Sequence, residues 1–500
     1  MKAFTFIFFK FLFFVILHIR AFSYTILVIF LRLCDLIPGC SYENDVTGIT
    51  SDTRFIQPGF LFIPLKGNNF SGDEFITEAI NKKVSGIILE KFVPNLGVPC
   101  ITCDDSKETL KKLLVKFYHE PYNDMCLIGV TGTDGKTTTS TIISYLLSSI
   151  SSSGYIGTNG IMLKEEHFPS LFTTQLLSEN YRILSAAKQL NIKYLAMEVS
   201  SQGIVAGRVD TLKYDYVVFT NLSHEHLDTH HTLDEYFKAK FKLFSMVKKT
   251  NKKIVNKDDD YAKYFESLTD VIYYSIYTVS DYQAKNIRYI NNSTFFDLYT
   301  KDKIYQNIRI NRMEEYNIYN ILPGIIIALL EGIDINILYK KLNHLPIIPG
   351  RLEKINCDYP FDIYIDFAHT PNALEAVLTS LKKRTKNRLI IVCGAAGKKD
   401  KSKRPLMGKV ACKFADFVVF TSEDPRFENP MDIIKQMVSE ITSTNYICIE
   451  ERTKAISFAI DMATSGDTII VTGKGREKYF EQNGIVYAYS DYDYIKKVIT

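Results

Sequence analysis

Thr131-Gly132-Thr133-Asp134-Gly135-Lys136-Thr137-Thr138 is the stretch that decides the fold. It follows the apolar run 126–130 and precedes apolar residues at helical spacing, so we expect a strand, a glycine-rich turn and a helix. Backbone N–H groups of such a turn form a cradle for phosphate. Lys136 can neutralise the β- and γ-phosphates, and the Thr137 hydroxyl can bind a phosphate-bridging Mg²⁺. Val130 stands where the usual P-loop has its first glycine, so this loop is a shortened variant. A turn without a ligand is the alternative, but it needs neither the lysine nor the threonines.

The composition is that of a globular enzyme with several domains. The chain has 500 residues, of which 46% are hydrophobic and 23% charged. A net charge of +4 without a basic stripe argues against nucleic acid as a partner. The nine cysteines follow no repeating framework, which is typical of free thiols in a reducing compartment.

Residues 1–34 form an apolar extension that Lys10, Arg20 and Arg32 interrupt. Its longest uncharged piece, Ala21–Leu31, is shorter than the roughly 20 residues that a membrane helix needs. Three interpretations stay open: a wrongly chosen start codon, a membrane-surface anchor, or a helix packed on the first domain. Because an ATP site needs cytosolic nucleotide, we expect a cytoplasmic protein. We also expect a monomer, with membrane contact only if the extension is real.

Short apolar runs alternate with segments of helical period from residue 126 onward, which predicts a mainly parallel, doubly wound α/β fold. Most runs end in small, acidic or basic residues, and ligands bind at the carboxyl ends of such strands. The expected strands are 126–130, 194–198, 214–221, 363–366, 389–394, 417–424 and 469–474. Pro121 and Pro349 mark boundaries, so we expect three domains: a smaller N-terminal α/β domain (1–122), a central P-loop domain (123–348) and a C-terminal Rossmann-like domain (349–500).

Three residues in the central part are candidate metal ligands. Glu198 ends a predicted strand and could complete the Mg²⁺ shell that Thr137 begins, although it could equally be an unrelated loop acid. His226, after the next strand, is a metal ligand or an ordinary loop histidine. Lys240 shares the apolar face of a predicted helix over 233–249, so it must snorkel, pair or lose its charge. Carbamylation by CO₂ would make it an anionic ligand.

Four polar clusters follow successive strands of the C-terminal part. They are Asp366–Pro371, Gly394–Asp400 with Lys403–Pro405, Glu423–Arg426 and Gly473–Glu477. Basic side chains beside turn glycines favour carboxylate or phosphate ligands, and Arg426 can grip a carboxylate bidentately. Together the clusters predict one shared cleft.

The chain resembles the Mur ligase family of ATP-dependent amide-forming ligases from about Gly48 to its end. The resemblance is carried by the phosphate loop together with Ser51-Asp52-Thr53-Arg54, Met197-Glu198-Val199-Ser200-Ser201, His226-Leu227-Asp228, Asp366-Phe367-Ala368-His369-Thr370-Pro371 and Lys403-Arg404-Pro405. It is similar to the members that add the third residue of the peptidoglycan stem peptide to UDP-N-acetylmuramoyl-L-alanyl-D-glutamate.

The resemblance implies a role for each matched residue. ATP would be held by Gly132, Thr133, Asp134, Gly135, Lys136, Thr137, Thr138, Asn320, Arg351 and Asp366. The uridine nucleotide and its muramoyl dipeptide would be held by Ser51, Thr53, Asn68, Asn69, Phe70, Thr173, Thr174, Ser200 and Arg208. Thr137 and Glu198 would bind one Mg²⁺ ion, and His226 and carbamylated Lys240 (N6-carboxylysine) would bind a second. Lys136, Glu198, His226 and Lys240 would be the catalytic residues. The incoming amino acid would be held by Lys399, Glu423, Asp424, Pro425, Arg426, Gly473 and Glu477.

Arg426 implies that this amino acid is meso-diaminopimelate. In the family members that add it, an arginine at this position contacts its distal carboxylate. This chain reads Glu-Asp-Pro-Arg where the family usually has Asp-Asn-Pro-Arg. Lys399, Phe172 and Ala206 also replace an arginine, an asparagine and a glutamine. L-Lysine as the added amino acid, folylpolyglutamate synthesis and a catalytically silent nucleotide-binding homologue are the alternatives.

Overall fold

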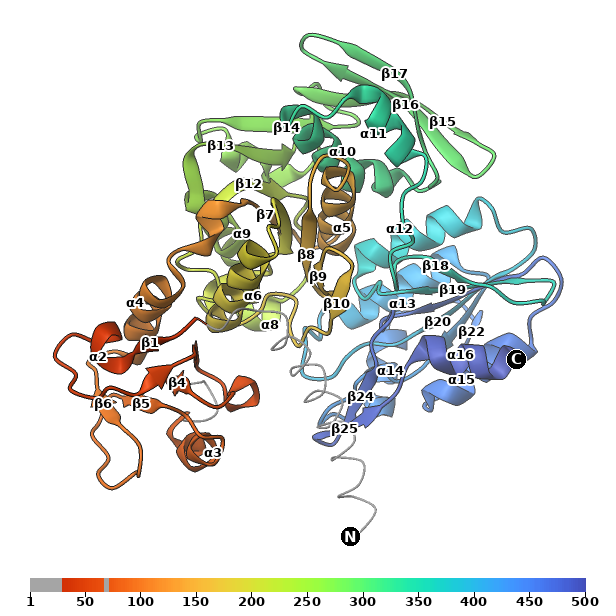
Figure 1. The fold of residues 1–500 in the computed structure, drawn as a ribbon. Coiled ribbons are helices and arrows are strands. Elements are labelled where there is room, and N and C mark those ends of the chain that lie inside the picture. Colours follow the sequence, from red (N-terminus) through yellow and green to blue (C-terminus); the bar gives the residue numbers. More distant parts are fainter. Residues whose placement is uncertain (1–28, 67–71) are drawn as a thin grey trace. The chain divides into compact units, whose positions relative to one another are not determined.

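The computed structural model describes residues 29–66 and 72–500, and these divide into two compact units (Figure 1). The first unit takes its described residues from 29–66, 72–129, 150–217 and 242–252, and the second consists of 130–149, 218–241 and 253–500. Most of the apolar extension and residues 68–70, predicted for the uridine nucleotide, lie outside the described residues. No helix within the described ranges is both long and apolar enough to cross a bilayer.

The first unit begins with a four-stranded parallel sheet of order β3-β4-β5-β6. One face of this sheet packs into a core that includes Phe62, Ala79 and Ile87. The elements here are β1 (Leu31–Arg32), α2 (Leu33–Leu36), β2 (Asp45–Val46), β3 (Gly48–Thr50), η1 (Thr53–Phe55), β4 (Phe60–Phe62), η2 (Gly72–Phe75), α3 (Ile76–Asn81), β5 (Gly86–Leu89), β6 (Cys100–Thr102), α4 (Ser106–Tyr118) and η3 (Pro121–Asp124).

The rest of the first unit contains a second group of paired strands. β11 pairs in parallel with β8, while β9 pairs antiparallel with both β8 and β10. The elements are β8 (Ser153–Gly157), β9 (Gly160–Leu163), β10 (Glu166–Phe168), α6 (Leu177–Gln189), β11 (Tyr194–Glu198), α7 (Ser201–Val205) and η4 (Lys242–Met246). Strands β7 (Cys126–Thr131), β12 (Tyr214–Phe219) and β13 (Val247–Asn256) each run from one unit into the other.

The second unit contains the helix that follows the phosphate loop, α5 (Lys136–Leu147), which packs on the apolar helix α10 (Glu315–Leu330). Strands β14 to β17 continue from β13, and the last three pair antiparallel. The other elements are α8 (Leu227–His230), α9 (Leu233–Phe241), η5 (Asp260–Phe265), β14 (Val271–Ser275), β15 (Tyr282–Ile290), β16 (Ser293–Thr300), β17 (Ile304–Ile310) and α11 (Ile335–Leu342).

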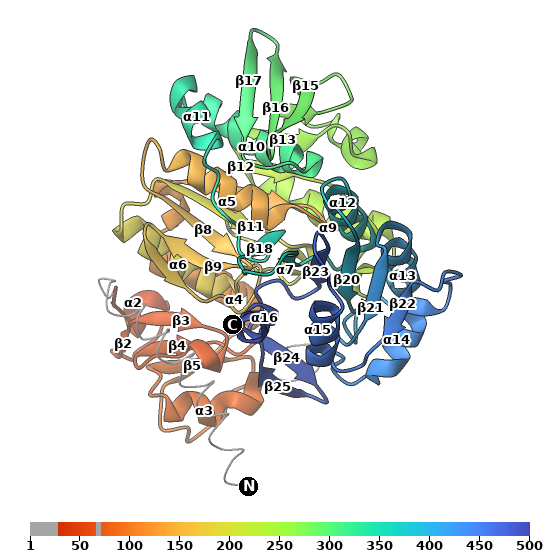
Figure 2. The same cartoon turned by 90° about the vertical axis from the view of Figure 1, so that its right-hand side faces the viewer.

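The C-terminal part of the second unit is a six-stranded sheet of order β18-β19-β23-β20-β21-β22, parallel except for β18. Helices α12, α13 and α14 cover one face, and α15 and α16 cover the other (Figure 2). The elements are β18 (Glu353–Ile355), β19 (Asp362–Asp366), α12 (Pro371–Lys382), β20 (Leu389–Cys393), α13 (Lys403–Phe414), β21 (Phe417–Phe420), α14 (Pro430–Val438), β22 (Tyr446–Cys448), α15 (Arg452–Asp461), β23 (Thr468–Thr472), β24 (Tyr479–Gln482), β25 (Ile485–Ala488) and α16 (Asp491–Ile499).

The predicted α/β fold is confirmed, and the expected strands lie where the apolar runs place them. The predicted helix over 233–249 is wrong in its second half. Helix α9 ends at Phe241, one 3₁₀ segment follows, and β13 begins at Val247. Val, Thr and Ile in the run 247–256 favour extended backbone, and this preference prevails over helical spacing. The three-domain division stays a prediction.

Candidate active site

The phosphate loop joins β7 to α5 through two glycines with left-handed or strained backbone. Gly132 has a φ of 154° and Gly135 a φ of 84°. A Cβ atom at Gly135 would lie 2.3 Å from Oδ1 of Asn320. Only glycine fits such a close approach without displacement. The loop therefore has the compact backbone of a phosphate cradle, with the predicted ATP residue Asn320 beside it.

Polar side chains around the loop include several of the residues predicted for ATP. Lys136 Nζ donates to the carbonyls of Gly132 and Thr133 at 2.9 and 2.7 Å. Arg351 donates from Nη2 to Thr137 Oγ1 at 2.9 Å, although the two residues are far apart in sequence. Burial raises the pKa of Asp366. The second unit therefore brings Lys136, Thr137 and Arg351 to one end of α5.

Lys240 is buried at this same loop. Its side chain is 1% exposed, and Nζ donates to the Gly132 carbonyl at 2.6 Å and lies 4.3 Å from the Tyr236 ring centroid. The ammonium therefore does not snorkel to solvent. Burial and the nearby Lys136 ammonium hold the pKa of Lys240 well below its usual value. Of the three interpretations of Lys240, this environment favours the one in which the side chain loses its positive charge.

Glu225 is the centre of a cluster of charges next to the predicted ligand His226. Its Oε1 atom lies 2.7 Å from His369 Nε2 and 3.4 Å from Lys403 Nζ, and its Oε2 atom lies 3.5 Å from His226 Nε2. Burial would raise its pKa, but the facing histidines and Lys403 hold the pKa of Glu225 well below its usual value. Burial lowers the pKa of His226 to about 3, so this ring is neutral and able to bind a metal.

His224, the residue before Glu225, makes further contacts with the segment before α13, closer to the protein surface. His224 Nε2 lies 2.8 Å from Ser402 Oγ and 3.3 Å from Asp400 Oδ2. Residues 224 and 225 therefore both tie the loop after β12 to residues at the start of α13, within the second unit.

The first unit holds the residues predicted for the muramoyl dipeptide. Thr174 Oγ1 accepts from the Ser200 backbone N–H at 2.9 Å, and Arg208 Nη1 donates to the Thr174 carbonyl at 2.8 Å. The Arg208 guanidinium lies over the Phe172 ring at 4.4 Å, and that of Arg54 at 5.6 Å. Two arginines on one aromatic ring suit an anionic ligand.

Three other predicted residues of this unit, Thr53, Thr173 and Glu198, are also hydrogen-bonded. Thr53 Oγ1 donates to Glu78 at 3.0 Å, and Thr173 Oγ1 lies 3.1 Å from Thr158 Oγ1. The Glu198 carboxylate is buried and accepts from the Thr158 backbone N–H at 2.9 Å. Ser51 is partly exposed.

The loop after β21 and the loop after β23 contain the residues predicted for the incoming amino acid. Lys474 is fully buried, and its Nζ lies 2.8 Å from Asp424 and 2.9 Å from Glu477. Glu423 is also buried, and its Oε2 atom has no hydrogen-bond partner among the described residues. Burial raises the pKa of Glu423. Gly473, with a φ of 104°, leaves the space in which this carboxylate lies.

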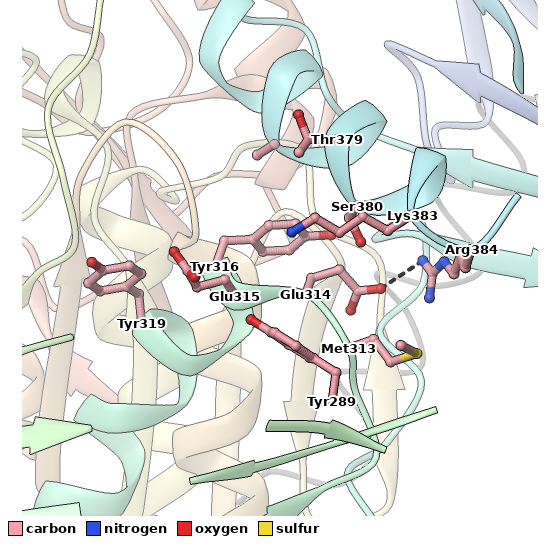
Figure 3. Close-up of a pocket in the computed structure, with 11 residues that line it drawn as sticks. Tyr289, Met313, Glu314, Glu315, Tyr316, Tyr319, Thr379, Ser380, Lys383 and Arg384 are labelled. Carbon is pink, nitrogen blue, oxygen red and sulfur yellow. Dashed lines mark ion pairs between the residues drawn. The ribbon is translucent and has the colours of Figure 1, made fainter. Parts of the chain in front are cut away.

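The second unit also has a pocket of ≈ 460 Å³ that none of the predicted site residues lines (Figure 3). Glu314 and Arg384 face one another across its wall at 2.7 Å. Its walls come from β15, from the start of α10 with the two residues before it, and from the second half of α12 with the two residues after it. The lining residues are Tyr289, Met313, Glu314, Glu315, Tyr316, Tyr319, Ala376, Thr379, Ser380, Lys383 and Arg384.

The predicted metal ligands are divided between the units, with Glu198 in the first and Thr137, His226 and Lys240 in the second. Across the described parts of the chain, no three or more His, Cys, Asp or Glu residues are grouped as a metal site. The predicted set also uses a threonine hydroxyl and a carbamate, which are not among those four residue types. Both offer oxygen atoms, the ligands that Mg²⁺ prefers. The assigned roles of all these residues stay predictions.

Sequence reasoning missed Glu225 and Glu481 as site residues. Glu225 directly precedes the candidate His226 in the loop after β12, and the histidine is the more obvious metal ligand of the two. Glu481 lies within β24 and carries no local signal, because only a long-range contact brings it to Arg426.

A shortened P-loop beside a buried lysine, joined to a doubly wound C-terminal sheet, defines a nucleotide-dependent enzyme. The Mur ligase middle domain matches residues 130–328, and the Mur ligase glutamate ligase domain matches residues 350–475. The chain belongs to the Mur ligase family and is an ATP-dependent acid–amino-acid ligase.

Individual relatives match over nearly the whole chain. The UDP-N-acetylmuramoyl-L-alanyl-D-glutamate–2,6-diaminopimelate ligase of Caldanaerobacter subterraneus subsp. tengcongensis is 34% identical over 94% of this chain and 99% of its own. The UDP-N-acetylmuramyl-tripeptide synthetase 2 of Oceanobacillus iheyensis is 37% identical over 87% of this chain and 90% of its own. A solved structure of a 2,6-diaminopimelate ligase of this kind is 27% identical, with a TM-score of 0.60, over 94% of this chain and 99% of that chain.

Proposed function

We propose that this protein adds meso-diaminopimelate to UDP-N-acetylmuramoyl-L-alanyl-D-glutamate in peptidoglycan precursor synthesis, with ATP as the energy source. The names of relatives that match most of the chain support the reaction. The observation that carries it in this structure is the Lys240 amino group buried against the phosphate loop, 2.6 Å from the Gly132 carbonyl. Because the reaction consumes ATP, we place the protein in the cytoplasm.

The phosphate loop would bind ATP through its backbone N–H groups and Lys136. The close approach of Asn320 to Gly135 and the Arg351–Thr137 hydrogen bond support a site for the nucleotide at this end of α5. Arg351 and Lys136 would neutralise the charge that gathers on the phosphoryl oxygens. Mg²⁺ bound at Thr137 with Glu198, and at His226 with carbamylated Lys240, would supply further charge neutralisation.

The buried environment of Lys240 supports its carbamylation. The neutral amine would add to the carbon of CO₂ and release a proton, which converts a buried cation into an anionic oxygen ligand. Neutral His226 would complete this ligand pair. An uncompensated buried ammonium is costly, whereas a metal-bound carbamate is paired.

The muramoyl dipeptide would bind the first unit through Thr174, Ser200 and Arg208. Arg54 and Arg208 on the Phe172 ring supply the positive charge that its carboxylates need. The D-glutamate γ-carboxylate would attack the γ-phosphorus of ATP, forming an acyl phosphate and releasing ADP. The amine of the incoming amino acid would then attack the acyl carbon, and phosphate would leave. The protein contributes mainly positioning and electrostatics to these steps.

The amino acid would bind the loops after β21 and β23. The buried Glu423 oxygen without a partner is an acceptor for an ammonium group, and Arg426 is a donor for the distal carboxylate. L-Lysine lacks that carboxylate and would leave Arg426 without its ligand.

The test is phosphate release by the purified full-length chain. We expect release only when ATP, the nucleotide dipeptide and meso-diaminopimelate are all present. Release without the two acceptor substrates would indicate a plain ATPase and contradict the proposal. A preference for L-lysine over meso-diaminopimelate would refute the role of Arg426.

A further inference from the structure

The segment 349–353 leads from the central part of the second unit into its C-terminal sheet, and its backbone is strained. Gly350 has a φ of 68° and Leu352 a φ of 42°. A positive φ is uncommon for a residue with a side chain, and it costs free energy that the surrounding structure must offset. Arg351, which is predicted to bind ATP, stands between these two positions. The placement of its guanidinium therefore depends on whatever holds this segment.

Arg351 contacts the phosphate loop from the strained segment. Its Nη2 atom donates to Thr137 Oγ1 at 2.9 Å, and its guanidinium carbon lies 4.7 Å from the ring centroid of Phe367. Because the arginine side chain is long, a small change in the backbone at 350–352 would move the guanidinium away from this hydroxyl. The contact is therefore sensitive to the conformation of the segment.

Glu353 fixes the segment from its C-terminal end. The carboxylate is 8% exposed, and its Oε2 atom accepts from the Gly350 N–H at 2.8 Å, which closes a tight loop around Arg351 and Leu352. The same carboxylate forms an ion pair with Arg476 through two contacts, of which Nε to Oε2 measures 2.8 Å and the other joins Nη2 to Oε1. A bidentate pair of this kind fixes orientation as well as distance.

Arg476 is itself held in the loop after β23. Its guanidinium carbon lies 3.2 Å from the ring centroid of Tyr492, on α16. A Cβ atom at Gly350 would lie 2.8 Å from the backbone nitrogen of Arg476 and 3.0 Å from Cα of Gly475, so the two backbones are in direct contact. The fully buried Lys474 ties this loop down independently through two carboxylate partners. The loop is therefore the fixed support, and the segment 349–353 is the part that it positions.

We propose that Glu353 and Arg476 are positioning residues for ATP, because their ion pair keeps the segment in the strained conformation that directs Arg351 to the phosphate loop. This inference rests on the proposed function, in which Arg351 meets the phosphoryl oxygens of ATP. Neither Glu353 nor Arg476 touches the nucleotide, and both act through Arg351. Without the pair, Leu352 relaxes, and only a fraction of the molecules present Arg351 in the binding conformation.

The experiment measures the binding of a non-hydrolysable ATP analogue, AMP-PNP, to the full chain with Mg²⁺ by isothermal titration calorimetry. Glu353→Gln keeps an acceptor for the Gly350 N–H but removes the charge, and we expect a roughly tenfold higher Kd. Arg476→Gln should also raise the Kd. The double variant should raise it by less than the product of the two single effects, because the two residues act as one unit.

Steady-state phosphate release supplies a second measurement on the same variants. The KM for ATP should rise by a factor similar to that of the Kd. The KM for the nucleotide dipeptide, whose predicted residues lie in the first unit, should change by less than about twofold.

The matched control is Asp467→Asn. Asp467 is fully buried and pairs with Arg388 at 2.7 Å, so its pair resembles that of Glu353 with Arg476. It precedes β23 and therefore lies at the opposite end of this strand from the loop that contains Arg476. Its replacement should lower Tm but leave the Kd for AMP-PNP unchanged.

A Kd for Glu353→Gln within about twofold of wild type would overturn the proposal. An equal increase for Asp467→Asn would also overturn it, because general destabilisation would then explain both. Independent, multiplying effects of the two substitutions would refute a pair that acts as a unit. If wild type does not bind AMP-PNP, the proposed function fails, whereas binding by wild type with no effect of either substitution refutes the positioning pair alone.

Discussion

Replacing Glu225 with glutamine should lower the free energy of unfolding of the second unit by about 2–3 kcal/mol. Glu225 is 4% exposed and faces His369 at 2.7 Å and Lys403, which is 5% exposed, at 3.4 Å. Removal of one partner from a buried ion pair costs about 3–5 kcal/mol. The cost here falls below that range, because the His369 side chain is 29% exposed and the glutamine oxygen still accepts a hydrogen bond.

The assay is thermal unfolding of the full chain near pH 6, followed by circular dichroism. A loss of this size should lower the Tm of a unit as large as this one by about 3–6 °C. The matched control is Glu440→Gln, whose partner Lys409 is as exposed as Glu440 itself and whose loss should cost less than about 1 kcal/mol. A Tm for Glu225→Gln within about 1 °C of wild type would refute the reasoning.

The same cluster predicts the pH dependence of that difference. Burial alone would lower the pKa of His369, and Lys403 lowers it further, but the Glu225 carboxylate and the Phe367 carbonyl raise it above the usual value. A raised pKa in the folded state stabilises the fold below the unfolded pKa, and that stability is lost as pH rises through the folded pKa. The Tm difference between wild type and Glu225→Gln should therefore be larger at pH 6 than at pH 9. A difference that grows with pH would contradict this sign.

Three further predictions concern single lysines and one buried arginine. Lys136→Ala should abolish phosphate release, and near-normal turnover would exclude its role at the phosphates. Lys240→Ala should be nearly inactive but partly rescued by acetate, and full activity without acetate would exclude the metal-ligand role. Arg452→Met should destabilise the chain by about 3–5 kcal/mol in urea unfolding, because it leaves fully buried Asp491 without the guanidinium 2.6 Å away. An unchanged urea midpoint would show that Asp491 finds another partner.

Elements with strong local patterns could be predicted from the sequence. The apolar runs that become β7, β11 and β20 begin at the residues where these strands begin in the structure. The helix expected over 233–249 failed where strand-forming residues continue the apolar pattern, since spacing alone does not separate the two. Even so, the buried position of Lys240 on the face of Tyr236 and Phe237 is confirmed.

The long-range pairs could not be predicted. Arg426 and Glu481 are 55 positions apart, and Glu225 and Lys403 are 178 apart. Arg426 and Lys403 stand in clusters that the sequence picks out, but Glu225 and Glu481 are ordinary acids in their local sequence, and nothing there names the partner of any of the four. Their partners depend on which loops the sheets bring to the same edge.

The sequence by itself determined the phosphate loop, because a strand, two glycines, a lysine and a helix within residues 126–147 specify their own backbone. It also determined the family, since the matching motifs are short and contiguous. Only the tertiary structure decided that Lys240 meets the Gly132 carbonyl, that Glu225 meets His369, and that Glu481 meets Arg426. Ion pairs and buried amines depend on distances of a few ångströms between distant segments, and charge interactions weaken rapidly outside that range in water.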